Sequence, residues 1–320
     1  MVRSPIDEPL LTLAESQAGM LTRAQLRAAG ISDAVVRGRL VSQWRAVLPG
    51  VVQLSRAPLD EHARYLAATL MAGPEAVITG VAAARLLGLT SAGTPQVVDL
   101  LVPAHRAPRT ASFVRVCRTH RMPHARRQLG PLPVALPARA VADACRTSAD
   151  TRFAEALVIE AVQRRTTTLT LLHDELYAGP RQRSAVLRAG IAAAATGAWS
   201  VAEHDLVRVV GRSTVLPTPV LNPRLVGPDG GQLPTPDLWF DDVGLAVQVH
   251  SHAYHADGDA WTRTVRADSA LAEAGVTRVA LTPREIRTAP DEVLARLERT
   301  YLSMKDRPRT AARATPRPLH

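Results

Sequence analysis

The segment Leu233–His255, which reads LPTPDLWFDDVGLAVQVHSHAYH, restricts the possible folds more than any other part of the 320-residue chain. Two short apolar runs, 238–240 and 243–249, flank an Asp-Asp turn, and Asp237 precedes the first run. A cluster of polar side chains accompanies and follows the second run: Gln248, His250, His252 and His255. Polar groups at the ends of adjacent strands can converge on one divalent cation. The pattern therefore predicts a small sheet that carries a metal-dependent phosphodiesterase site.

Residues 200–301 resemble the PD-(D/E)XK nuclease superfamily, and within it the very-short-patch-repair-like endonuclease branch. The opening Ser-Val-Ala-Glu step ends at Glu203, which matches the glutamate of that family's first helix. Asp237 matches its first metal carboxylate, and His255 matches the histidine that follows its second strand. The resemblance implies a Mg²⁺ or Mn²⁺ ion held by Asp237.

The second strand departs from the family pattern. Where the family has Glu-Val-Asp-Gly, this chain has Gln248-Val249-His250-Ser251, so an amide replaces an acidic ligand. Because Gln248 is neutral, we expect a weak or absent Mg²⁺ site, and no cofactor is assigned with certainty. Imidazoles such as His250 suit softer metals, yet the spacing matches no closed zinc motif. We therefore favour an inactive nuclease fold over an active enzyme. In the active alternative, Glu203 supports the metal and His250 or His255 serves as base or phosphate contact.

Composition favours a polyanionic partner. The chain has 39 basic and 29 acidic residues, a net charge of +10 and a pI near 10.9, which is typical of nucleic-acid-binding proteins. Its 2 cysteines form no CxxC motif, which excludes a disulfide framework and a zinc finger. The first ten residues lack the apolar core of a signal peptide, and the run 190–199 is too short to span a bilayer. We expect a cytoplasmic protein without a membrane partner.

Residues 7–55 have the pattern of a winged helix. After a first helix at 10–17, Thr22 and Ser32 can cap helices at 23–29 and 33–41, and Gly30 can end the earlier one. Two β-like runs, 44–48 and 51–54, flank Pro-Gly and predict the hairpin wing.

The same segment, LTRAQLRAAGISDAVVRGRLVSQWRAVLPGVVQL, resembles the N-terminal winged helix of AbiEi-type antitoxins. Members of that family act as transcriptional repressors or antitoxins, often beside a toxin. The resemblance implies a recognition helix at 33–41 whose arginines face phosphates or bases, and a basic wing. The expected DNA-contacting residues are Arg23, Arg37, Arg39 and Arg45. Winged helices also serve as protein-interaction modules, and that alternative stays open.

The middle region is predicted to mix helices and strands. We expect helices at 60–72, 75–87, 138–145, 151–164, 168–176 and 184–196, strands at 97–102 and 113–118, and a connector at 131–137. Residues 105–127 contain seven arginines, three histidines and no acid, as a phosphate-tracking loop or a solvated hairpin would. In the AbiEi-like step PARAVAD, which ends at Asp143, we expect Arg139 to pair with a nearby acid.

The expected fold class is α/β of the α+β type. Four parts are predicted: a winged-helix DNA-binding domain (1–56), an AbiEi-like α/β middle region (57–198), a PD-(D/E)XK nuclease-like domain with a restriction-endonuclease-like mixed sheet flanked by helices (199–304), and a disordered basic tail (305–320). The expected function is a regulator or antitoxin-like protein that binds double-stranded DNA, with an inactive nuclease-fold domain. The alternatives are a metal-dependent DNA endonuclease acting through Asp237 and a module that binds a toxin partner.

Overall fold

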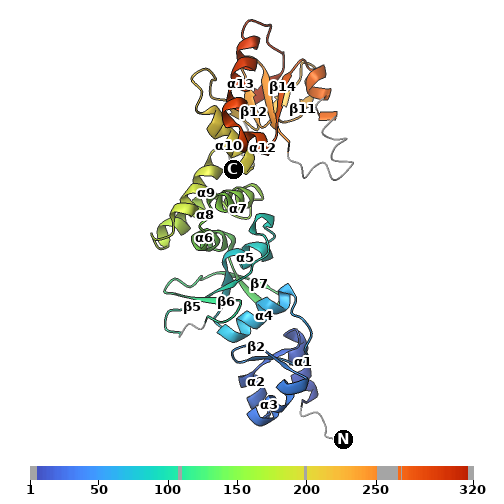
Figure 1. Cartoon of the computed structure of the whole chain (residues 1–320), viewed down its shortest axis with the longest axis vertical. Coiled ribbons are helices and arrows are strands. Elements are labelled where there is room, and N and C mark those ends of the chain that lie inside the picture. The colour runs from blue at the N-terminus through green and yellow to red at the C-terminus, as the bar shows by residue number, and fades with distance from the viewer. Residues whose placement is uncertain (1–5, 107–109, 198–199, 251–265, 268, 316–320) are drawn as a thin grey trace. The chain divides into compact units, whose positions relative to one another are not determined.

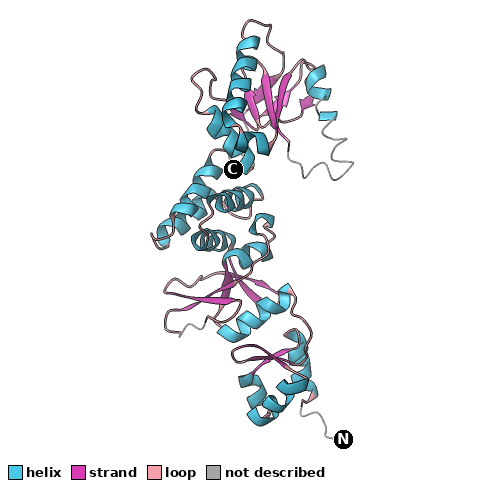
Figure 2. Ribbon diagram, viewed as in Figure 1, coloured by secondary structure: helices cyan, strands magenta, loops and turns pink. Residues whose placement is uncertain are grey.

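The computed structural model describes all residues except 1–5, 107–109, 198–199, 251–265, 268 and 316–320 (Figure 1). The chain divides into two compact units. The first comprises Met1–Phe153 and Thr170–Leu187, and the second comprises Ala154–Leu169 and Arg188–His320. Both units contain helices and strands (Figure 2), which confirms the predicted α+β class.

The first unit begins with three helices and two wing strands in the predicted order, and with a further strand, β1, that the sequence pattern did not predict. The elements are α1 (Glu8–Ser16), β1 (Met20–Thr22), α2 (Arg23–Ala28), α3 (Asp33–Ser42), β2 (Arg45–Leu48) and β3 (Val51–Gln53). The strands are antiparallel in the order β1-β3-β2. The Thr22 side chain accepts from the Gln25 amide, and the Gln25 side chain accepts from the Thr22 amide, so a reciprocal capping box starts α2. Ser32 caps α3 as its sequence position predicts.

This sheet is buried on both faces. Leu21, Trp44 and Val52 pack with α1, α2 and α3 in one hydrophobic cluster. Met20 and Val51 belong to a second cluster with α4 (Glu61–Ala72). Burial on both faces anchors the small helical module to the rest of the unit, because apolar surface is removed from water on each side.

A five-stranded sheet follows, in the order β6-β5-β4-β8-β7. Its strands are β4 (Val77–Thr79), β5 (Val98–Pro103), β6 (Val114–Thr119), β7 (Arg126–Leu129) and β8 (Leu132–Ala135). β5 and β6 are parallel, as are β4 and β8, and the other pairs are antiparallel. The strands β6 and β7 therefore form the two edges of the sheet.

Two predictions for this region are wrong. Residues 75–87 do not form one helix, because Val77–Thr79 pair with β5 and α5 (Gly80–Leu86) starts only at Gly80. Residues 131–137 are not a plain connector, because the hairpin turn at Gly130 (φ +58°) returns the chain as β8. In both places pairing with distant strands overrode the local signals of glycine, proline and helix propensity.

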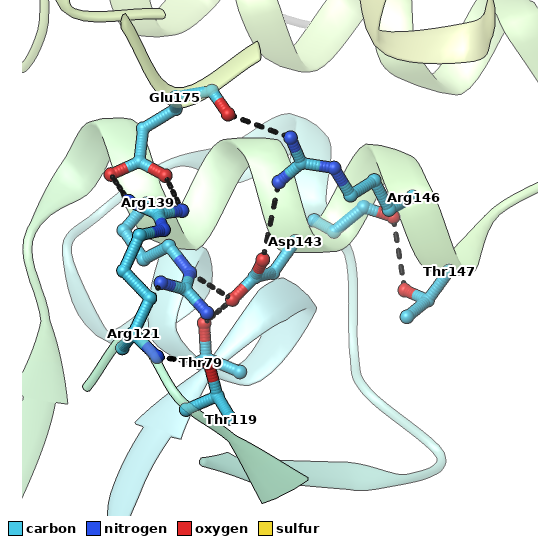
Figure 3. Close-up of polar contacts among 9 residues, drawn as sticks. Thr79, Thr119, Arg121, Arg139, Asp143, Arg146, Thr147 and Glu175 are labelled. Atoms are coloured by element: carbon cyan, nitrogen blue, oxygen red, sulfur yellow. Dashed lines mark hydrogen bonds and ion pairs between the residues drawn. The ribbon is translucent and has the colours of Figure 1, made fainter. Parts of the chain in front are cut away.

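The middle helices lie close to the predicted positions. They are α6 (Pro137–Thr147), α7 (Thr151–Gln163), α8 (Leu169–Ala178) and α9 (Ala185–Ala195), and a short 3₁₀ turn, Thr90–Ala92, follows α5. Figure 3 shows a polar network in which Arg139 Nε donates to Asp143 Oδ2 at 2.7 Å. Thr79 donates its hydroxyl to the same oxygen at 2.7 Å. The predicted pairing of Arg139 with a nearby acid is confirmed, and it ties α6 to β4.

The second unit contains a mixed sheet in the order β14-β13-β12-β9. Its strands are β9 (Val220–Leu221), β12 (Leu238–Phe240), β13 (Leu245–Val249) and β14 (Thr277–Leu281), with β13 and β14 parallel. The helices α10 (Val201–Val210), α12 (Pro283–Thr288) and α13 (Pro290–Met304) share one core with Phe240 and Val247. Trp239 and Ala246 point to the opposite face and pack with Leu271. A helix is expected at 260–274; residues 260–265 and 268 lie outside the described residues, and residues 266–267 and 269–273 are helical.

Within the predicted disordered tail (305–320), residues 313–315 form a strand, and residues 316–320 lie outside the described residues. A second small sheet joins β11 (Gln232–Leu233), β10 (Arg224–Val226) and β15 (Arg313–Thr315), with β10 in the middle. Ala312 is fully buried, and the Thr310 hydroxyl donates to the Ala274 carbonyl at 2.9 Å. Backbone pairing with β10 supplies the order that side-chain composition does not reveal.

Within the described residues, no helix has both the length and the apolar character needed to cross a bilayer.

Candidate functional site

Helix α3 presents most of its surface to solvent. Of its residues only Val36 is buried, and Val41 is 81% exposed. Arg37 is exposed and makes no hydrogen bond or ion pair with any described part of the chain. A helix exposed in this way, with a free guanidinium, has the form of a helix that enters the major groove of DNA.

The other predicted DNA-contacting arginines have different surroundings. Arg23 Nη1 donates to Asp33 Oδ1 at 2.9 Å, which links the start of α2 to α3. Arg45 Nη2 donates to Gln53 Oε1 and to the Ala57 carbonyl, both at 2.8 Å, so this wing arginine is held against the protein. Arg39 donates to Gln43 one turn further along α3. The structure thus groups the four arginines on one module, but it leaves Arg37 as the one that is unpaired within the described residues.

In the second unit, Glu203 is fixed at the start of α10. Its amide donates to Ser200 Oγ at 3.2 Å, and Ser200 Oγ donates to Glu203 Oε1 at 3.0 Å. Asn222, which follows β9 with a φ of +46°, donates through Nδ2 to Glu203 Oε2 at 3.2 Å. Glu203 is only 8% exposed and Asn222 only 3%, so both groups are buried beside each other.

Asp237 lies at the start of β12, close to this pair. Its Oδ2 accepts from the Val249 amide at 2.6 Å, and its own amide donates to the Val247 carbonyl at 3.0 Å. Burial, and after it the negative charge of Glu203, together raise the pKa of Asp237 to about 7, against the opposing effect of the hydrogen bond from the Val249 amide. The predicted pair of acids is therefore brought together in a site with little access to water.

Gln248 stands opposite Asp237 on the neighbouring strand. Leu238 pairs with Val247, so the next position outward places Asp237 across from Gln248 on the same face of the sheet. The side-chain oxygens Gln248 Oε1 and Asn222 Oδ1 are buried without a hydrogen-bond partner in the described part of the chain. Unpaired buried oxygens are costly, and a bound cation would satisfy them.

These donors fit a hard divalent cation. Two carboxylates and two amide oxygens are the ligand types that Mg²⁺ and Mn²⁺ accept. Among the described residues, no three His, Cys, Asp or Glu side chains are grouped so that they could hold a metal. A cation at this place would therefore depend on the amide oxygens as well as on Asp237 and Glu203.

His250 directly follows β13, on the same face as Gln248. Its amide donates to the Leu281 carbonyl at 2.8 Å, and Arg278 Nη1 lies 3.1 Å from its Nε2. Because a guanidinium only donates, Nε2 must accept, which fixes the neutral tautomer with the proton on Nδ1. His252 and His255, the other predicted histidines, lie outside the described residues.

Sequence reasoning missed Asn222 and Arg278. The pattern of residues 220–225 predicts one strand, although the Asn-Pro step within it favours a turn, and in the structure Asn222 lies between β9 and β10. Arg278 reaches the site because β14 pairs in parallel with β13, with Arg278 beside Ala246. No local signal predicts that register.

No protein-family model and no characterised protein sequence matches the chain. Its function must therefore be inferred from the geometry of these two sites.

Proposed function

We propose that this chain is a DNA-binding regulator, of the antitoxin-like type, whose α3 docks in the major groove of duplex DNA. The observation that supports the proposal is the outward face of α3, where Arg37 is unpaired within the described residues and Ala34, Gly38 and Val41 leave room for close approach. The net charge of +10 supplies the general attraction to phosphate that such docking requires.

The contacts of Arg23 and Arg45 support this role indirectly. Arg23 holds α2 to the first turn of α3 through Asp33, and Arg45 ties the wing strand β2 to β3. A reading helix must be fixed in position before it can discriminate between bases, so these contacts preorganise the module.

Fluorescence anisotropy of the full chain with a labelled duplex library tests the proposal. We expect Arg37→Gln to weaken binding roughly tenfold and to lower the slope of log affinity against log salt by about 0.9, the value for one phosphate contact. Arg208→Gln is the matched control, because Arg208 is an exposed arginine of α10 without a contact in the described residues. Equal affinity of the Arg37 variant and the parent would contradict the docking of α3.

A second candidate function is metal-dependent DNA cleavage in the second unit. The observation that favours it is the partly buried Asp237 and the buried Glu203, together with the unpartnered side-chain oxygen of Gln248 opposite Asp237. Those side chains would hold the cation, and a bound divalent cation would polarise a phosphodiester and activate water. His250 would have to release Arg278 before it could take a proton at Nε2.

Incubation with plasmid, linear duplex and single-stranded DNA in Mg²⁺ or Mn²⁺ separates the two candidates. Cleavage by the parent that is lost in Asp237→Ala would make the chain a nuclease. Gln248→Glu restores one acidic ligand, so cleavage that appears only in this variant would show that one missing charge silences the site. If neither the parent nor Gln248→Glu cleaves DNA while both bind the duplex, the result supports the DNA-binding regulator and rejects the nuclease candidate.

A further inference from the structure

A depression in the first unit lies beyond the ends of two parallel strands. β5 ends at Pro103 and its parallel neighbour β6 ends at Thr119. The depression has a volume of about 890 Å³. It is lined by the last residues of β5 and β6 and by the residues that follow these strands. The carboxyl ends of parallel strands are a recurrent place for ligands, because the chain leaves the sheet there and its loops form a crevice.

The lining of this depression offers hydrogen-bond donors and positive charge. His105, Arg118 and His120 line it, and no acidic side chain does. Arg118 is exposed and makes no hydrogen bond or ion pair in the described part of the chain. Thr119 Oγ1 accepts from the Arg121 amide at 3.0 Å, which leaves the hydroxyl proton free to donate to a ligand. Such a set of donors matches the oxygens of a phosphate group.

One wall of the depression is held rigidly by the network in Figure 3. Arg139 Nη1 donates to the Arg121 carbonyl at 3.1 Å, and Arg121 Nη1 donates to Glu175 Oε1 of α8 at 3.0 Å. Arg139 is itself held by Asp143. The segment that carries Thr119 and His120 is thus fixed through both its backbone and a side chain, so little ordering is required when a ligand binds.

The neighbouring acid does not neutralise this surface. Glu75 accepts from Arg106 Nε at 2.8 Å and is therefore already paired on the strand-end turn that carries His105. Arg115, one residue before the lining begins on β6, is likewise paired with the buried Asp99. Arg118 remains as a cation that the described chain does not compensate.

We propose that this depression binds the sugar–phosphate backbone of duplex DNA, as a contact separate from the outward face of α3. Its open form and the absence of Phe, Tyr and Trp from its lining favour a backbone over a base-containing small ligand, because these side chains provide the large flat surfaces on which bases stack. Arg118, one of the seven arginines in 105–127, is thereby assigned a phosphate contact, one of the two interpretations that the sequence left open for this stretch.

The test measures the affinity of the full chain for a labelled duplex of about 40 base pairs between roughly 50 and 200 mM salt. Arg118→Gln is compared with Arg127→Gln, which removes the same charge from an exposed position on β7, the opposite edge of the same sheet. We expect Arg118→Gln to weaken binding roughly tenfold and to lower the salt slope by about 0.9, as the loss of one charge-assisted phosphate contact does. Arg127→Gln is expected to change the affinity less than about twofold.

Each outcome decides the proposal. Equal losses in the two variants would mean that only overall charge matters, and would overturn it. Titration with inorganic phosphate gives the other contradiction: Arg118-dependent phosphate binding with unchanged DNA affinity would make this a site for a small phosphate compound.

Including Arg37→Gln separates this proposal from the docking of α3. A loss of DNA affinity in Arg118→Gln without a loss in Arg37→Gln would support the DNA contact at the depression and contradict the docking of α3. The reverse pattern would reject the depression alone, and absence of any DNA binding would overturn both.

Discussion

The clearest energetic consequence of the second unit's site concerns the proton on Asp237. Asp237→Asn keeps the shape of the side chain and its ability to accept from the Val249 amide, which lies 2.6 Å from Oδ2 in the parent. The substitution removes the negative charge that burial and Glu203 both oppose. We therefore expect the variant to be more stable than the parent at high pH in the absence of metal.

The magnitude follows from proton linkage. The pKa of Asp237 is about 7 in the folded chain, against an ordinary value of 3.8. Below pH 4 both folded and unfolded chains are protonated, so the group has no effect on stability. As pH rises from about 4 to 7 the unfolded chain releases its proton first, so stability falls, and it levels off above pH 7. A pKa difference of this size corresponds to roughly 4 kcal/mol, an upper limit for the gain in Asp237→Asn at pH 8.

The assay must report on the second unit alone, because the chain unfolds as more than one unit. Hydrogen exchange of peptides that cover β12 and β13, followed in EDTA across a urea series from about pH 5 to 8, gives the local free energy of unfolding. Glu273→Gln is the control, because Glu273 is exposed and has no partner in the described residues. In a thermal scan, the same gain should raise the transition by roughly 8 to 16 °C.

Two results would refute this reasoning. The first is a parent whose second unit is equally stable at pH 5 and pH 8. The second is an Asp237→Asn variant that behaves like Glu273→Gln at pH 8. Either would mean that the carboxyl of Asp237 is not held in a desolvated site next to Glu203.

Three further predictions follow from individual contacts. Gln248→Glu should tighten Mn²⁺ binding at least tenfold in calorimetry, because it adds a carboxylate opposite Asp237, and unchanged affinity would remove Gln248 from the cation site. Arg139→Met should lower the stability of the first unit by roughly 3 kcal/mol in urea unfolding, since Asp143 loses its 2.7 Å partner while it stays shielded; a loss under about 1 kcal/mol would contradict a stabilising network. Deletion of residues 307–320 should destabilise the second unit by roughly 3 kcal/mol and speed exchange in β10, because β15 and the burial of Ala312 are lost; unchanged exchange would show that the segment is dispensable.

Local signals in the sequence predicted the elements that depend on local physics. The caps Thr22 and Ser32 and the stop at Gly30 predicted α2 and α3 to within a residue or two, because capping hydrogen bonds form between near neighbours. The apolar run 238–240 matches β12, and the run 243–249 contains β13 (Leu245–Val249), since a turn separates the two runs.

Short elements that depend on pairing between strands were missed. β4 pairs with β5 and β8, which lie further along the chain, and β8 adds this pairing with β4 to its local hairpin with β7. β15 is a three-residue strand in a segment rich in proline and arginine, and only β10 gives it a partner. Composition reports what a segment can do alone, whereas these strands are stabilised by contacts across long stretches of chain.

The candidate site shows the same division. Glu203 and Asp237 were predicted together because the resemblance of residues 200–301 to PD-(D/E)XK nucleases implies that both face one site. Asn222 and Arg278 were not, although each contacts a predicted residue: Asn222 binds Glu203, and Arg278 binds His250. The first supplies an additional oxygen, and the second engages the ring nitrogen that a general base would use.

The proton on Asp237 and the neutral side chain of Gln248 determine the charge of the candidate cation site near neutral pH. Asp237, with a pKa of about 7, carries a proton on about half of the molecules at pH 7, so a cation must displace that proton to bind. Cation affinity should then rise with pH until Asp237 is fully ionised. Since Gln248 contributes no charge, the site at neutral pH has fewer than two full negative charges from Asp237 and Glu203 to offset a divalent ion. A weak, pH-dependent cation site of this kind supports the hypothesis of an inactive nuclease fold over that of an efficient nuclease.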